Sequence, residues 1–186
     1  SSGFDIRMQE QEANSQTHAV EDICFIAWQP SSGSFEGITF EHSNWNLPEK
    51  GYCGIQACMF TDRTSESRNW SKVPAAIELN LADRCSFDQC TIRNMGGSGI
   101  WIRRNCLNCE ITHSHIYHIA GNGVGMGEGK DRMTESGPWW KSVPEEVSEG
   151  NKISHCLIEK CGSQFHGAVG IWCGLVARTR MEHNEI

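Results

Sequence analysis

The chain has 186 residues, enough for one domain with a continuous core, and 38% of them are hydrophobic and 21% are charged. The 16 basic and 23 acidic residues give a net charge of -7, and the longest basic run is Arg103-Arg104. This charge excludes nucleic acid as an expected partner. The apolar stretches are too short to predict a membrane span.

The first nineteen residues (1–19) are polar and show no pattern, which indicates a loop or the frayed end of a repeat. The chain starts without Met and reaches Ile186 inside a pattern typical of a strand. We therefore expect residues 1–186 to form a single repeat-built segment that is truncated at both ends.

An internal repeat organises the middle of the chain. Residues 85–102 and 109–126 match at an offset of 24, so that Phe87 aligns with Ile111, Ile92 with Ile116, and Ile100 with Val124. Apolar residues alternate with other residues within each unit, as they do in short strands with one buried face. Leucine-rich repeats share this length, but their Leu/Asn framework is absent. The repeat predicts an all-β fold, a right-handed parallel β-helix (solenoid) whose stacked coils share one core.

Two long insertions interrupt the period, at about residues 44–73 and 129–149, and a smaller one lies near 163–168. The first lies between Phe40 and Ile77, and the second lies between Met126 and Ile153. Insertions in repeat proteins loop out of the stack and often carry the binding function. The sequence thus predicts two long loop insertions beside the repeat.

Stacking places equivalent residues of successive units in columns. The outward columns on one sheet are Glu78–Trp101–Gly125–Trp172 and Asn80–Arg103–Gly127–Gly174, with Arg104 and Glu128 just beyond the strand ends. We expect a flat, exposed platform on which glycine allows another molecule to approach the backbone.

Six of the seven tryptophans fall on or around this surface: Trp45, Trp70, Trp101, Trp139, Trp140 and Trp172. Indoles stack on the apolar faces of sugar rings, and charged groups bind sugar hydroxyls. The alternative is that these tryptophans pack the insertions onto the repeat. The sequence leaves both interpretations open.

Cysteine and histidine also recur in register. Cys85-x4-Cys90 and Cys106-x2-Cys109 have spacings similar to a four-thiolate zinc site. Cys90, Ser114, Cys156 and Asn184 share one position, which favours a ladder of small residues over metal or redox chemistry. Gln89, His113, His155 and His183 share another, which favours a solvated histidine ladder over metal binding by His113, His115 and His118. We predict no metal and no cofactor.

From about residue 35 onward the chain resembles β-helical carbohydrate-active enzymes, most closely those of glycoside hydrolase family 141. The segments that carry this resemblance are GITFEHSNW (37–45), GGSGIWIRRNCLNCEITHSHIYHIAGNGV (96–124), HGAVGIW (166–172) and MEHNEI (181–186). The resemblance implies a secreted or periplasmic protein, monomeric when full length, that acts on plant cell-wall glycans as fucosidases and xylanases do. It also implies that the paired catalytic carboxylates follow residue 186.

Hydrolysis of a glycosidic bond needs two carboxyl groups. Within this segment the best candidates for catalysis are Glu128 and Asp131. The expected substrate-binding residues are Trp101, Trp172, Arg103, Arg104, Glu78, His166, Trp139 and Trp140. Two rival functions stay open, a polysaccharide lyase with an arginine base and a non-catalytic glycan-binding or adhesin solenoid.

Overall fold

A computed structural model describes residues 32–47, 49, 52, 54, 56 and 71–186. Residues 1–19, Trp70 and much of the 44–73 insertion lie outside these described residues. The protein is mostly β, and its main sheets are parallel. Helix in the described part of the chain is confined to α1 (Trp139–Ser142) and the 3-10 turn η1 (Pro144–Glu146), neither long enough to cross a membrane.

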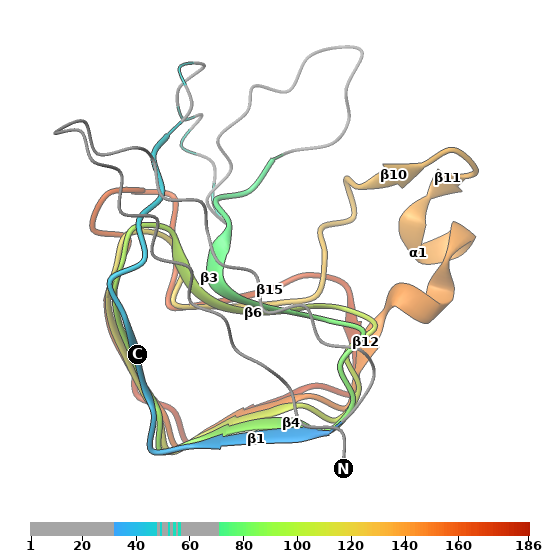
Figure 1. Cartoon of the computed structure of the whole chain (residues 1–186). Coiled ribbons are helices and arrows are strands. Elements are labelled where there is room, and N and C mark those ends of the chain that lie inside the picture. The colour runs from blue at the N-terminus through green and yellow to red at the C-terminus, as the bar shows by residue number, and fades with distance from the viewer. Residues whose placement is uncertain (1–31, 48, 50–51, 53, 55, 57–70) are drawn as a thin grey trace, which may run out of the picture.

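Three parallel sheets form the body of the protein, and successive strands along the chain visit them in turn (Figure 1). The first sheet contains β1 (Gly33–Glu36), β4 (Cys85–Asp88), β7 (Glu110–Thr112), β13 (Lys152–Ser154) and β17 (Arg180–Glu182). The second contains β2 (Thr39–Glu41), β5 (Thr91–Met95), β8 (His115–Ile119) and β14 (Leu157–Cys161). The third contains β3 (Ala75–Asn80), β6 (Ser98–Arg104), β9 (Val124–Met126) and β15 (Ile171–Cys173).

Strand pairing confirms the 24-residue register. Phe87 pairs with Ile111 in the first sheet, and Ile92 pairs with Ile116 in the second. One detail of the outward columns is wrong, because a register shift between Leu79 and Asn80 pairs Asn80 with Arg104 instead of Arg103. An extra residue of this kind locally breaks the alternation that the column prediction assumed.

The apolar interior draws side chains from all three sheets. Ile92, Ile100, Ile111 and Ile116 are fully buried, and Phe87 stacks on Phe35 of the preceding unit with ring centroids 4.8 Å apart. Full burial of an aliphatic side chain contributes about 1.5–3 kcal/mol. Because the partners of each residue come from neighbouring units, this stabilisation depends on stacking.

The ladder of small residues is confirmed. The backbone N–H of Cys90 donates to Ser114 Oγ at 3.0 Å, and that of Cys156 donates to Asn184 Oδ1 at 3.0 Å. Cys90, Cys106, Cys109, Cys156, Cys161 and Cys173 carry free thiols, and the described residues hold no group of three or more His, Cys, Asp or Glu arranged for a metal ion.

The histidine ladder is also present, at the corner between the first and second sheets. The rings of His113 and His155 stack with centroids 5.1 Å apart, and those of His155 and His183 with centroids 5.0 Å apart. Each of these residues, like Gln89, has a φ near +50° (47° to 55°). A repeated left-handed residue turns the chain at this corner in every unit.

The 129–149 insertion is more than a loop, which corrects the prediction. It contains an antiparallel hairpin, α1 and η1, and it ends in a strand that returns to the body. The hairpin is β10 (Met133–Thr134) with β11 (Gly137–Pro138), and the returning strand β12 (Ser148–Glu149) pairs with β16 (Val176–Ala177). The buried Trp139 anchors the insertion by donating from Nε1 to the Gly129 carbonyl at 2.8 Å.

Candidate functional site

Two indoles meet over a glycine on the outer face of the third sheet. Pairing confirms the column Glu78–Trp101–Gly125–Trp172. Trp101 and Trp172 flank Gly125, and their rings make an edge-to-face contact with centroids 6.0 Å apart and planes at 88°. A Cβ on Gly125 would lie 2.9 Å from Trp101 Cδ1. Gly125 therefore makes room for the indole of Trp101, not for an approaching molecule as expected.

The prediction that Trp101 is exposed is wrong. Trp101 points away from the apolar interior, yet it is only 4% exposed, and its Nε1 donates to the Gly127 carbonyl at 2.8 Å. The Arg103 guanidinium lies 4.3 Å from the ring centroid. The outer face is consequently not a flat platform, and of the two indoles only that of Trp172, which is half-buried, is partly open.

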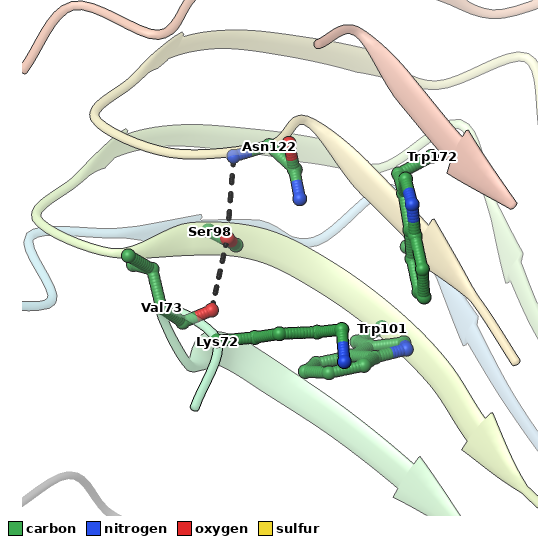
Figure 2. A pocket seen from close by; sticks show the side chains of 7 residues that line it. Lys72, Val73, Ser98, Trp101, Asn122 and Trp172 are labelled. Atoms are coloured by element: carbon green, nitrogen blue, oxygen red, sulfur yellow. Dashed lines mark hydrogen bonds between the residues drawn. The ribbon is translucent and has the colours of Figure 1, made fainter. Parts of the chain in front are cut away.

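A pocket lies between the indoles and the corner that precedes β6 and β9 (Figure 2). At this corner Ser98 Oγ donates to the Val73 carbonyl at 3.2 Å and accepts from the Asn122 N–H at 3.2 Å. The Asn122 side-chain oxygen accepts from the Val169 N–H at 3.0 Å. Its amide nitrogen turns toward the side of Lys72 and the indoles (Figure 2). The corner thus offers the pocket a hydrogen-bond donor.

Lys72 supplies the charged group of the pocket. Its side chain is 6% exposed, and its Nζ lies 3.9 Å from Asp131 Oδ1 and 5.5 Å from the centroid of the Trp172 ring. Burial lowers the pKa of the Lys72 ammonium, and the nearby carboxylates of Asp131 and Glu128 only partly oppose this. Lys72 is therefore a desolvated cation beside a half-buried indole.

A cluster of ion pairs adjoins Trp101. Arg103 donates from Nε to Glu128 and from Nη1 to Glu78 at 3.1 Å, and Arg104 Nε lies 3.7 Å from Glu128 Oε1. Glu128 is 2% exposed, so the expectation that this acid faces solvent at a strand end is wrong. Burial lowers the pKa of Arg103, but the charges of Glu128 and Glu78 outweigh it and raise the pKa overall.

Three other predicted site residues lie apart from the pocket and the ion pairs. Trp139 is fully buried as the anchor of its insertion, and Trp140 is exposed beside Lys141. His166 is exposed and makes an edge-to-face contact with Tyr52, whose hydroxyl accepts from the Gly167 N–H at 3.0 Å. The structure thus brings together Trp101, Trp172, Arg103, Arg104, Glu78 and Glu128, with Asp131 joined to them through Lys72.

Sequence reasoning missed the pocket residues Ser98, Asn122 and Lys72. Ser98 and Asn122 are register mates at the 24-residue offset, so the repeat itself carried a signal for them. Lys72 lies outside the repeated pattern, at the end of the first insertion, and the sequence gives no sign that its side chain folds back over Trp172.

Comparison with solved structures indicates a glycoside hydrolase-like fold for these parallel sheets. The chain is similar to a solved structure named glycoside hydrolase, with a TM-score of 0.72 and 25% sequence identity over 83% of this chain. It spans 29% of the length of that protein. No protein-family model matches the chain. A search of curated proteins finds no match either.

Proposed function

We propose that the chain is a right-handed parallel β-helix belonging to a glycoside hydrolase that acts on plant cell-wall or related polysaccharide. The described outer face supplies a substrate subsite, and the full-length protein is a secreted or periplasmic monomer. The observation that carries this proposal is the pocket beside Trp172, which combines an indole with buried hydrogen-bond donors on Lys72 and Asn122. The likeness to a solved structure named glycoside hydrolase supports the same function.

Sugar recognition needs an apolar surface for ring C–H groups and polar groups for hydroxyls. Trp172 offers the first and Lys72 the second. Trp101 supports this subsite because its ring makes an edge-to-face contact with that of Trp172. The Trp101 ring is itself held by its hydrogen bond to the Gly127 carbonyl and by Arg103. His166 and Trp140 are proposed as outer contacts for a longer glycan.

The two acid candidates differ in their surroundings. Glu128 is buried between Arg103 and Arg104, which suits a residue that holds the arginines in place. Asp131 lies beside Lys72 and is the acid that the pocket cation contacts. We propose Asp131 as the local carboxylate nearest to bound sugar and Glu128 as a positioning residue. Hydrolysis requires a second, suitably spaced carboxyl group.

The test compares Trp172→Ala with Tyr117→Ala in the intact protein, with xylan and fucosylated oligosaccharides as substrates. Tyr117 is an outward aromatic of the second sheet that contacts His115 and Arg93, so its loss is a matched control. Loss of the stacking indole should raise KM about tenfold, because aromatic stacking contributes about 1.5 kcal/mol. Tyr117→Ala should leave KM unchanged, and equal values for both variants would refute the subsite.

The same assay separates the rival functions. A lyase would release products with an ultraviolet-absorbing double bond and would lose activity with a chelator. A non-catalytic solenoid would bind glycan without turnover. The pairing of Arg103 and Arg104 with glutamates argues against a free arginine base.

A further inference from the structure

The side chain of Lys72 is unusually buried for a lysine. It precedes β3, and its side chain runs along the outer face of the third sheet beside Trp101 (Figure 2). Only 6% of the side chain is exposed, and Nζ lies 5.5 Å from the centroid of the Trp172 ring. Lysine is almost never buried without a partner, because its ammonium loses hydration.

The described protein groups around Lys72 offer its ammonium few hydrogen-bond acceptors. An ammonium carries three donors, and a charge-assisted hydrogen bond to a carboxylate spans about 2.7–2.9 Å. The contact with Asp131 Oδ1 spans 3.9 Å, which is an ion pair without a hydrogen bond. The described neighbours thus balance the charge of Lys72 but leave its donors available to an acceptor that enters the pocket.

The surrounding charges indicate what kind of acceptor fits. Three cations (Lys72, Arg103, Arg104) and three carboxylates (Glu78, Glu128, Asp131) share this face, and ion pairs among them cancel every charge. Because Asp131 and Glu128 already balance the only cation that lines the pocket in the described residues, an entering carboxylate would lose its hydration without gaining a net attraction. Hydroxyl oxygens accept hydrogen bonds without that cost of desolvating a charge.

We propose that Lys72 is the specificity-determining residue of this subsite, whose Nζ donates hydrogen bonds to hydroxyl oxygens of an uncharged sugar stacked on Trp172. Asn122 Nδ2 is the second donor, and Asp131 holds the ammonium in place without consuming its donors. This inference rests on the proposed function, since it assumes that the pocket binds a glycan.

The test measures binding of the full chain by isothermal titration with three neutral probes (xylohexaose, cellohexaose and 2′-fucosyllactose) and the acidic hexagalacturonate. Wild type should bind a neutral probe and should prefer it to hexagalacturonate. Lys72→Met keeps the length and apolar stem of the side chain, and it should weaken that binding about ten- to hundredfold, as expected for lost hydrogen bonds to a charged group. Lys152→Met is the matched control, since Lys152 pairs with Glu182 at 3.6 Å on the first sheet.

Each other result has a definite meaning. If wild type binds no probe, the proposed function fails together with this inference. If wild type binds but Lys72→Met binds equally well, the role of Lys72 alone is overturned, and a preference for hexagalacturonate overturns the uncharged ligand.

Lys72→Gln decides the matter if Lys72→Met does not fold. Glutamine keeps a polar side chain beside Asp131 but is shorter and uncharged, so the proposal expects affinity to fall about fivefold, the difference between a charged and a neutral hydrogen bond. Wild-type affinity in a folded Lys72→Gln protein would overturn the proposal.

Discussion

Replacing Gly125 by Ala tests the packing of the two indoles directly. The new Cβ would lie 2.9 Å from Cδ1, 3.0 Å from Cγ and 3.3 Å from Nε1 of Trp101. An indole is rigid, and this one is also held by its hydrogen bond to Gly127 and by Arg103. The ring must therefore move as a whole and strain or break these contacts.

The expected cost follows from two contributions. Overpacking of a filled site costs about 1–3 kcal/mol, and the loss of the indole hydrogen bond costs about 1 kcal/mol. We expect Gly125→Ala to lower the free energy of unfolding by about 3 kcal/mol. Urea unfolding followed by circular dichroism measures this change, and near-ultraviolet circular dichroism reports the Trp101–Trp172 contact.

Gly37→Ala is the control. Gly37 has a φ of +65°, and a Cβ there would meet no atom within 4 Å. It should cost about 1–2 kcal/mol through backbone strain alone and leave the near-ultraviolet spectrum unchanged. A Gly125→Ala protein that keeps the wild-type spectrum and loses less than about 0.5 kcal/mol of stability, a typical surface effect, would show that Gly125 is not needed for the packing of the indoles.

Two further predictions concern charged residues. Glu128→Gln leaves Arg103 and Arg104 without their shared buried carboxylate and should destabilise the protein by about 3 kcal/mol in urea unfolding. Glu182→Gln, at a partly exposed pair with Lys152, should cost less than about 1 kcal/mol, and equal losses would contradict the buried ion cluster. The second concerns Asp88, whose pKa is lowered to about 2 by hydrogen bonds from the Thr112 hydroxyl, His113 and Gln89. Because the folded pKa lies below the unfolded value of about 3.9, this stabilisation is complete above about pH 4 and is lost as the pH falls through about 2. The stability advantage of wild type over Asp88→Asn should therefore shrink between pH 4 and pH 2, and an advantage that stays constant across this range would argue against these bonds.

Much of the candidate site was predictable, but its exposure was not. Strand register brought Trp101 and Trp172 to opposite sides of Gly125, as the repeat predicted. The repeat could not predict that the two rings lean over the glycine and touch, because ring contact depends on side-chain torsions across three strands. The same limit applies to Glu128, whose burial follows from its arginine partners.

The periodic pattern of the sequence is enough to specify which residues face inward and which repeat unit stacks on which. Alternation of apolar residues and the 24-residue offset reflect local backbone geometry, and each buried Ile such as Ile92 or Ile116 needs the matching residue of the next unit. The fold of the 129–149 insertion and the positions of Lys72 and Trp101 become apparent only in three dimensions. Those positions depend on contacts between segments that follow no repeat, so no periodic signal in the sequence records them.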